Sequence, residues 1–393
     1  MSTRLRNKKQ PDEPPRPLPL PEGITSDYVD CTPSCGLKFH VLKAGEPGKP
    51  LVLFCHGFPE LAFSWRKILP KVAEAGYYCV APDQRGYGRT LGWERHQYFP
   101  NVELGDYTMT NLVRDLVCLV YGLGYTSVHS IIGHDFGAVG SAMAALMRPD
   151  MFRSTIQMSH PHHPPPLPPD PAAPKKINIQ HELSYLQPPR SHYKWHNAGG
   201  SAASDWENPP QGIEKFLRGY FHVKSADWDR NDPRPLKSWS AKELAVMPEY
   251  YIMRDLKSMA ETVMSLMNGE DFSKTERWLS KQDLQVYCDD WTRNGYQGAL
   301  NWYRAQTETT PQSARDMYLC AGRKIEVPCV FISGKKDWGT YQQPGALESY
   351  TDPNCVKESC FRGVKLLEGA GHWVQQEQPE VVIREILAFF DTL

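Results

Sequence analysis

The segment SIIGHDFGAVG, residues 130–140, constrains the fold more than any other part of the chain. It passes from an apolar strand-like run through Gly133 and Gly137 into a stretch of small residues typical of a helix. Two glycines placed around one polar residue, Asp135, predict a sharp strand-to-helix turn of the nucleophile-elbow type. Such a turn displays its central side chain beyond the end of a β-strand. We therefore expect the carboxylate of Asp135 to be accessible to a ligand.

Short apolar runs alternate with amphipathic segments from about residue 27 onward. Runs such as KPLVLFCHG and YYCVAPD are rich in β-branched and aromatic residues, whereas TNLVRDLVCLVYGLG places leucines and valines at helical spacing. The alternation predicts an α/β fold with a mostly parallel, doubly wound sheet, because parallel strands need crossover connections. The predicted strands lie within residues 49–57, 77–83, 127–135, 155–160, 327–337 and 364–373, and a terminal helix lies within 379–390.

A change of composition divides the chain at residue 160, where HPHHPPPLPPDPAAP begins. Proline removes backbone donors and stops both strands and helices. The following segment, 164–320, carries aromatic residues at helical spacing, so we predict a helical cap domain inserted into a core of residues 27–163 and 321–393. Residues 1–26 are predicted to be a disordered, proline-rich basic tail.

The overall charge excludes some classes of partner. The 44 basic and 45 acidic residues nearly cancel, so no global field favours nucleic acid or an anionic membrane. No apolar run has the length of about 18 residues that a membrane-spanning helix needs. Cysteines inside apolar runs fit a reducing compartment, so we predict a cytoplasmic protein whose partner is a small molecule. The sequence leaves the oligomeric state open.

Two groups of metal-ligating residue types occur, at Cys31 and Cys35 and at His160, His162 and His163. The cysteine pair has no second pair at ligand spacing, and the histidines alternate with prolines that fix no ligand geometry. We predict neither a metal ion nor another cofactor.

Four polar signals follow predicted strands: residues 56–59 (His-Gly-Phe-Pro), Asp135, Asp337 and His372. Ligands bind beyond the carboxyl ends of strands in an open parallel sheet. A reactive residue on an elbow, then an acid, then a histidine is the chain order of an α/β-hydrolase triad. We therefore predict that Asp135, Asp337 and His372 form a catalytic triad.

Six stretches of the sequence closely resemble the epoxide hydrolase branch of the α/β-hydrolase family, including the hydrolase domain of the soluble epoxide hydrolases. The stretches are CHGFPELAFSWR, DQRGYGRT, GHDFGAVG, NWYR, SGKKDWG and GAGHWVQQEQP. The resemblance is strongest in the predicted core and weaker in the cap. It implies an α/β-hydrolase fold with an inserted cap and the conversion of an epoxide to a vicinal diol.

An aspartate nucleophile suits attack on a saturated carbon. A serine would become an ether that water does not readily cleave, whereas Asp135 would become an ester. His372, oriented by Asp337, would then activate a water molecule to hydrolyse that ester. The backbone N–H groups of Phe58 and Phe136 are predicted to form the oxyanion hole.

Ring opening needs proton donors, and the resemblance assigns these to two cap tyrosines. Tyr303, in NWYR, matches the family motif, and Tyr193 occupies the corresponding point in the first part of the cap, with Tyr220 and Tyr185 as rivals. A phenol stays protonated at neutral pH and can donate. Packing of the cap against the core would also explain these aromatic residues.

We predict that the substrate is a hydrophobic epoxide bound by His56, Phe58, Pro59 and Trp302. Other aromatic and apolar residues of the cap fit such a substrate, although core packing explains them equally well. They are Trp195, Trp206, Trp291, Phe221 and Met267.

Two other functions use parts of the same pattern. A haloalkane or haloacid dehalogenase would use the same aspartyl ester, but the Phe136 side chain offers no N–H donor for halide, whereas many related enzymes have a tryptophan indole there. A silent binding protein could hold a small apolar ligand under the cap, but an intact triad disfavours this reading.

Overall fold

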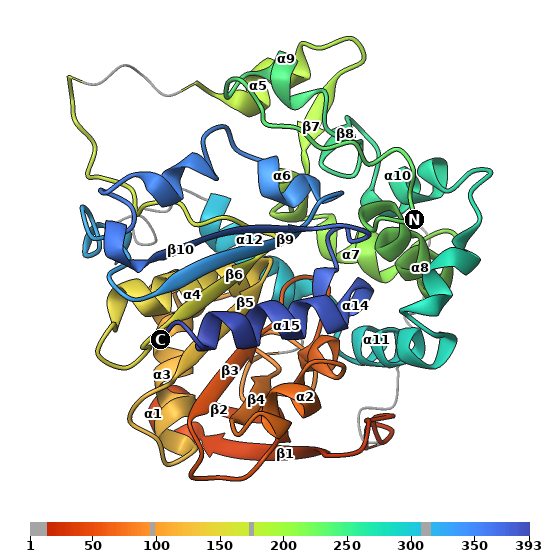
Figure 1. The fold of residues 1–393 in the computed structure, drawn as a ribbon. Helices are drawn as coiled ribbons and strands as arrows, with labels where there is room; N and C mark the ends of the chain where they lie inside the picture. Colours follow the sequence, from red (N-terminus) through yellow and green to blue (C-terminus); the bar gives the residue numbers. More distant parts are fainter. Residues whose placement is uncertain (1–13, 95–98, 173–176, 308–315) are drawn as a thin grey trace.

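The computed structural model describes residues 14–94, 99–172, 177–307 and 316–393 (Figure 1). Its centre is an eight-stranded sheet with the strand order β1-β2-β4-β3-β5-β6-β9-β10. Neighbouring strands from β4 to β10 are parallel, whereas β1 and β2 are antiparallel at one edge. The α/β fold with a mostly parallel sheet is thus confirmed. The strands are β1 (Ile24–Cys31), β2 (Leu37–Ala44), β3 (Leu51–Cys55), β4 (Tyr78–Pro82), β5 (Ser130–His134), β6 (Thr155–Met158), β9 (Cys329–Gly334) and β10 (Phe361–Leu367).

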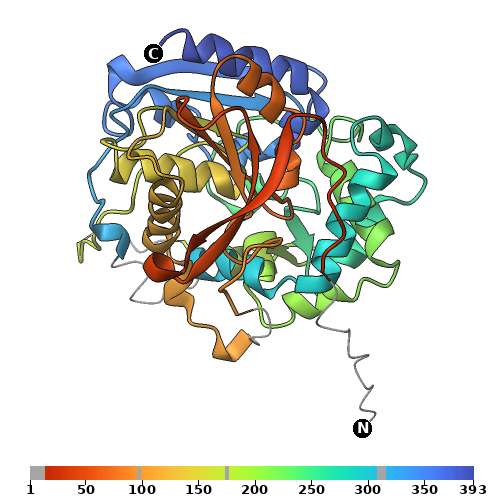
Figure 2. The ribbon, with the colours of Figure 1, turned by 90° about the horizontal axis from the view of Figure 1, so that it is seen from below.

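Helices cover both faces of this sheet. Along β3, Leu51, Leu53 and Cys55 pack on one face with α3 (Met109–Gly122) and α4 (Phe136–Met147). Val52 and Phe54 pack on the other face with α2 (Leu69–Glu74) and α15 (Pro379–Phe390), as Figure 2 shows for the blue and orange helices. A strand that is buried on both faces needs apolar residues at consecutive positions. These strands could therefore be predicted from continuous apolar runs in the sequence.

The edge strands β1 and β2 were not predicted. In β1 the side chains from Thr25 to Tyr28 are all exposed, so the strand has no continuous apolar run. It is held by its backbone pairing with β2, from Ile24 opposite Ala44 to Cys31 opposite Leu37. Backbone hydrogen bonding of this kind leaves a weak sequence signal. The short helix α1 (Thr32–Cys35) connects the two strands.

The predicted amino-terminal tail is too long. Residues 1–13 lie outside the described residues, but Leu18 and Leu20 pack against the apolar clusters of the protein, and β1 begins at Ile24. The carbonyl of Arg16 accepts a hydrogen bond from the Arg89 guanidinium at 2.7 Å. Leucines between prolines can be buried without forming a helix or strand. The high proline content of this segment therefore led to the wrong prediction that all of it is disordered.

The segment between β6 and β9 forms an inserted, mainly helical cap, and its green and cyan elements gather to one side of the molecule (Figures 1 and 2). A two-stranded sheet within it, which the sequence did not predict, pairs β7 (Arg190–His192) with β8 (Ile252–Arg254). The cap helices are α5 (Ile179–Ser184), α6 (Tyr193–Asn197), α7 (Ala202–Glu207), α8 (Ile213–Lys224), α9 (Ala241–Leu244), α10 (Met259–Leu266), α11 (Lys281–Asn294) and α12 (Gln297–Thr307). None of the helices in the described part of the chain combines the length and apolarity needed to cross a bilayer.

The turn from β5 into α4 depends on close backbone approach. A Cβ built on Gly133 would lie 2.0 Å from the carbonyl oxygen of Gly137, and one on Gly137 would lie 2.1 Å from that of Cys55. Both neighbours are backbone atoms that side-chain rotation cannot move. The two glycines therefore allow α4 to start directly against the ends of β3 and β5.

We expect Gly137→Ala to lower the free energy of unfolding by about 3 kcal/mol, because its methyl group must displace a strand carbonyl. Gly140→Ala on the same helix is the matched control, since nothing lies within 4 Å of its built Cβ. Alanine there should stabilise the helix by about 0.5–1 kcal/mol. Urea unfolding followed by circular dichroism measures both changes, and equal effects of the two substitutions would contradict the close-approach explanation.

Candidate active site

Asp135 lies at the carboxyl end of β5 with φ of 53°, a left-handed backbone conformation that is rare for residues other than glycine. Its backbone N–H donates to the carbonyl of Met158 at 3.1 Å, which fixes the turn to the neighbouring strand β6. Its carboxylate Oδ1 accepts a hydrogen bond of 3.0 Å from the backbone N–H of Phe58. The turn therefore points a carboxylate at the end of β3, as the sequence predicted for an elbow.

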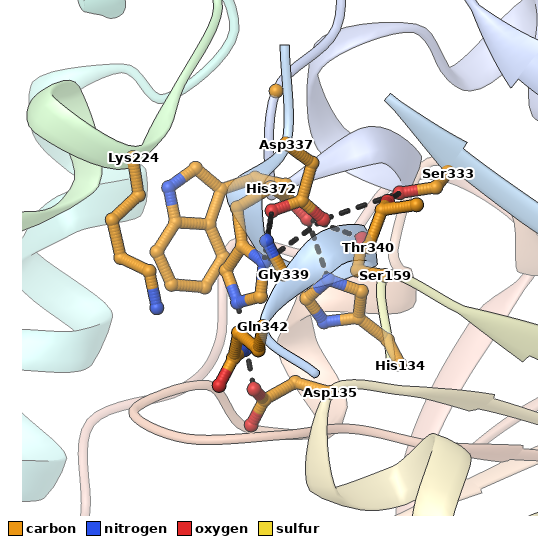
Figure 3. A network of polar contacts seen from close by, with 12 residues as sticks. His134, Asp135, Ser159, Lys224, Ser333, Asp337, Gly339, Thr340, Gln342 and His372 are labelled. Carbon is orange, nitrogen blue, oxygen red and sulfur yellow. Dashed lines mark hydrogen bonds and ion pairs between the residues drawn. The ribbon is translucent and has the colours of Figure 1, made fainter. Parts of the chain in front are cut away.

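His372 joins this carboxylate to a second one (Figure 3). The imidazole Nε2 lies 3.5 Å from Asp135 Oδ2, while Nδ1 lies 3.1 Å from Asp337 Oδ1 and 3.2 Å from Oδ2. The imidazole is fully buried. The structure thus brings together Asp135, His372 and Asp337 from three separate strand ends.

Asp337 follows β9 and is held by its own donors. Its Oδ1 accepts from the backbone N–H of Gly339 at 2.6 Å, and its Oδ2 accepts from the Ser333 hydroxyl at 3.2 Å. Burial alone would raise the pKa of Asp337, but the attraction and hydrogen bond of His372 outweigh it and lower the pKa. Asp337 therefore remains ionised at neutral pH and favours the His372 tautomer with a proton on Nδ1.

Asp135 has the same balance of effects. Burial would raise the pKa of Asp135, but the hydrogen bond and charge of His372, together with the charge of Lys224, hold it well below its usual range. The carboxylate is therefore ionised and nucleophilic at neutral pH.

The backbone around His372 is fixed by a buried network. The carbonyl of His372 accepts hydrogen bonds from His134 Nε2 at 2.6 Å and from Ser159 Oγ at 2.9 Å. His134 Nδ1 lies 2.6 Å from the buried carboxylate of Glu60. His134 precedes Asp135 in the sequence and supports the backbone of the site through these two contacts.

Glu377 in α14 (Val374–Glu377) holds the same loop from the other side. Its carboxylate accepts hydrogen bonds from the backbone N–H groups of Gly371 and Trp373, both at 3.0 Å, and from that of Ala226 at 2.8 Å. The first two donors flank His372 in the chain, and the third belongs to the cap. Burial raises the pKa of Glu377 to about 8, so the carboxyl group that ties the imidazole loop to the cap titrates just above neutral pH.

Two buried tyrosines of the cap lie close enough to Asp135 to be affected by its charge. The Tyr303 ring, on α12, packs edge-on against Phe136 at 4.6 Å and Phe58 at 5.4 Å between ring centres. The Tyr193 ring lies 5.8 Å from that of Tyr303, and its hydroxyl donates to Gln342 Oε1 at 3.0 Å. Burial and the charge of Asp135 raise the pKa of both phenols, so each keeps its proton at neutral pH.

The two rival tyrosines differ in position. Tyr185 is 70% exposed on the surface of the cap, which removes it as a donor to a buried site. Tyr220 is buried on α8, and its hydroxyl accepts a hydrogen bond from Lys224 Nζ at 3.4 Å.

Three predicted substrate contacts have core partners instead. His56 Nε2 accepts from the Gln84 N–H at 3.2 Å, and the Trp302 indole N–H donates to the Arg85 carbonyl at 2.9 Å. The Pro59 carbonyl accepts from the Trp291 indole at 2.9 Å. Because these polar groups bind within the protein, we assign His56, Pro59 and Trp302 to support of the site.

Sequence reasoning missed Lys224, Gln342, Glu60 and Glu377, which contact the site from the cap and from loops. The one local signal was a lysine ending the apolar run GYFHVK. In the described part of the chain, no group of three or more His, Cys, Asp or Glu side chains is arranged to hold a metal ion.

Comparison with known proteins supports both the fold and the activity class. Residues 50–179 match the family described as alpha/beta hydrolase fold. The chain is 32% identical to "Epoxide hydrolase A" of Mycobacterium tuberculosis over 362 residues, covering 91% of this chain and 95% of that protein. Its structure resembles an epoxide hydrolase from an endophytic Streptomyces, with a TM-score of 0.72, 27% identity and coverage of 94% and 96%. Epoxide hydrolase I of potato (Solanum tuberosum) gives a TM-score of 0.68 at 27% identity, with coverage of 94% and 100%.

The Glu60–His134 pair gives a prediction about stability and pH. Burial would raise the pKa of Glu60, but His134 lowers it; burial would lower the pKa of His134, but Glu60 raises it. The contribution of Glu60 to the free energy of unfolding is lost as pH falls below 4.5. The contribution of His134 declines as pH rises above 6.5. We expect Glu60→Gln to cost about 3 kcal/mol of unfolding free energy between these limits and less outside them.

The matched control is Glu74→Gln. Glu74 forms an exposed pair with Lys71 at 2.9 Å, so its loss should cost less than about 0.5 kcal/mol. Chemical unfolding at several pH values gives the comparison. A cost for Glu60→Gln that does not vary with pH would contradict the ion-pair assignment.

Proposed function

Because the chain belongs to the epoxide hydrolase family of the α/β-hydrolase fold, we propose that it opens an epoxide through a covalent ester at Asp135 and releases a vicinal diol. The observation that supports this most directly is the contact of one carboxylate with two groups. Asp135 Oδ1 binds the Phe58 N–H at 3.0 Å, and Oδ2 lies 3.5 Å from His372 Nε2. The two oxygens therefore have different environments and, we infer, different roles.

In the first step, Asp135 Oδ2 attacks a ring carbon, and the bond from that carbon to the epoxide oxygen breaks. The departing oxygen takes a proton from a cap phenol, for which Tyr303 and Tyr193 are the candidates. The products are an ester on Asp135, a free hydroxyl on the substrate and a phenolate in the cap. Ring strain of the epoxide assists this step.

In the second step, His372 Nε2 takes a proton from water, and the resulting hydroxide attacks Cγ of Asp135. Negative charge develops on Oδ1, which already accepts the Phe58 N–H. The Phe136 N–H at the start of α4 is the second proposed donor. Cleavage of the bond from Cγ to Oδ2 releases the diol with Oδ2 as its new hydroxyl oxygen. His372 gives its proton to the departing Oδ2, and the new carboxyl group of Asp135 gives its proton to the phenolate, which restores the resting enzyme.

The surroundings of the nucleophile favour a hydrophobic epoxide. Phe58 and Phe136 flank Asp135, and the rings of Tyr303 and Tyr193 cover it from the cap. Such walls offer apolar contact and few polar groups to a substituent. We also propose that residues 164–320 are the functional cap, since both candidate proton donors belong to it.

The cysteines support a cytoplasmic location. Cys55 and Cys329 are fully buried in the sheet, and burial raises the pKa of each thiol to about 12. Thiols of this kind serve as apolar packing groups, which is typical of proteins in a reducing compartment.

A single turnover in ¹⁸O-water with excess enzyme tests the ester. We expect the diol to carry unlabelled oxygen and the peptide containing Asp135 to gain the label, because water attacks the ester carbonyl. The His372→Gln variant should accumulate a mass adduct on the same peptide. His129→Gln is the control, because His129 packs between Tyr77 and Phe390 away from the site and its loss should leave turnover intact.

Two results would contradict the proposed function. Label found wholly in the diol would mean direct attack of water on the epoxide. Chloride released from a chloroalkane, with epoxides untouched, would indicate dehalogenation instead.

The proton donors give a separate prediction. We expect Tyr303→Phe and Tyr193→Phe each to slow ester formation by about 10²-fold or more, since each removes an acid that protonates the departing oxygen. Tyr185→Phe, in the exposed rival, should leave the rate unchanged. Quenched-flow mass measurement of the ester provides the rates. A Tyr303→Phe enzyme that forms the ester at the original rate would exclude Tyr303 as a donor.

A further inference from the structure

Lys224, the last residue of α8, places a buried ammonium group where the cap meets the core. The residue is 3% exposed. Its Nζ donates to the Tyr220 hydroxyl at 3.4 Å and lies 4.9 Å from the ring centre of Tyr251 and 5.4 Å from that of Trp373. Among the residues that the structure describes, no carboxylate oxygen lies within the 4.0 Å of an ion pair with Nζ. A charge held in this way has no local counter-ion, although its burial is costly.

The carboxylates that act on Lys224 are those of the active site. Burial lowers the pKa of Lys224 to about 8, and the charges of Asp135, Asp337 and Glu60 oppose that decrease. The group is thus mainly protonated at neutral pH. In Figure 3 its ammonium end is turned toward the side of the site where Asp135 and Gln342 lie.

The chemistry of the site requires a cation other than His372. His372 must be neutral to take a proton from water, so it cannot also be the positive charge that offsets Asp135. The lowered pKa values of Asp135 and Asp337 come first from His372, with a further contribution from Lys224, so Lys224 is the cation that remains when His372 is neutral. A desolvated carboxylate among aromatic rings would otherwise take up a proton and lose its nucleophilicity.

We propose that Lys224 is a positioning residue that acts as the counter-ion of Asp135. Its ammonium also stabilises the negative charge that moves to a cap phenol during ring opening. Its ammonium keeps Asp135 ionised while His372 is neutral. As the epoxide opens, negative charge moves from Asp135 to a cap phenol, and Lys224 attracts it in both places. Tyr251, which contacts the ammonium, also packs against the candidate donor Tyr193 at 5.0 Å between ring centres. The proposal rests on the aspartyl-ester mechanism above.

The backbone of Lys224 supports the same site, independently of its side chain. Its carbonyl accepts the His372 N–H at 2.9 Å, and a Cβ on Gly371 would lie 2.6 Å from that carbonyl oxygen. A side-chain substitution at position 224 leaves this contact available. The effect of the charge can therefore be measured with the imidazole loop in place.

Several titratable groups surround the ammonium, and most of them keep one charge throughout the pH range of the test. Burial raises the pKa of Tyr220 on α8 and of Tyr251 before β8, so both stay neutral. The lowered pKa values keep the carboxylates ionised above about pH 5. Three groups remain: His372, which the test removes, His134, whose pKa is raised, and Glu377, whose pKa burial raises to about 8. The arginine variant below controls for the last two, because they titrate whether position 224 is lysine or arginine.

The test isolates ester formation. In a His372→Gln background the ester accumulates, and its rate of formation from an aryl epoxide is followed by intact-protein mass between pH 6 and 10. We expect the rate to fall as pH rises through about 8, because the ammonium loses its proton there. Adding Lys224→Met should lower the rate at pH 7 by about tenfold or more and remove this pH dependence. Adding Lys224→Arg, whose cation does not titrate, should keep the rate high at alkaline pH.

Lys215→Met is the matched control, because Lys215 is exposed on the same helix and should leave both rate and pH profile unchanged. An alkaline decrease that persists in the arginine variant would assign it to another group and overturn the proposal. The proposal would also be overturned if the Lys224→Met variant formed the ester at the parent rate and with the parent pH profile. Failure of the His372→Gln parent to form any ester would instead refute the aspartyl-ester mechanism. If the methionine variant does not fold, the arginine profile alone decides.

Discussion

The hydrogen bond from the Phe58 N–H to the Asp135 carboxylate depends on how closely two adjacent strands end. β3 and β5 pair in parallel with Cys55 opposite Gly133, so their following residues leave the sheet side by side. A Cβ on Gly57 would lie 2.3 Å from Cβ of Asp135, which means that the approach is possible only without a side chain there. Glycines at positions 57, 133 and 137 thus bring the Asp135 carboxylate and the Phe58 N–H, the proposed nucleophile and oxyanion donor, within hydrogen-bonding distance.

This local constraint explains which parts of the protein could be predicted. The strands buried on both faces, the elbow and the order of Asp135, Asp337 and His372 each have a signal in a few consecutive residues. The edge strands and the β7–β8 pair depend on backbone pairing, which hardly alters composition. Lys224 illustrates a further limit: its ammonium contacts Trp373 and its carbonyl holds His372, but only the folding of α8 onto the loop after β10 creates those contacts. His56 and Trp302 illustrate the same limit, since nearness to a motif does not show that their polar groups bind Gln84 and Arg85.

Cap and core carry different halves of the proposed chemistry, so their relative position matters. Trp291 and Trp302 each bind a core carbonyl at 2.9 Å, and Arg66 of the core pairs with Asp283 of α11 at 3.0 Å. At the start of α12, a Cβ on Gly298 would lie 2.8 Å from the Gly86 carbonyl. The helix that bears Tyr303 is therefore seated directly on the loop after β4. These contacts fix the phenols relative to Asp135 without using the substrate's binding energy.

The boundary between cap and core also matters for the movement of charge. In the proposed mechanism the negative charge lies in the core, on Asp135, before ring opening, and in the cap, on a phenol, afterwards. A counter-ion attached to either side alone would favour one of these states and resist the transfer. Lys224 belongs to the cap through α8, yet its backbone carbonyl binds the His372 loop of the core. An ammonium at this junction remains near the charge in both states, so little reorganisation accompanies the transfer, and that is the condition under which a fixed dipole or charge lowers a barrier most.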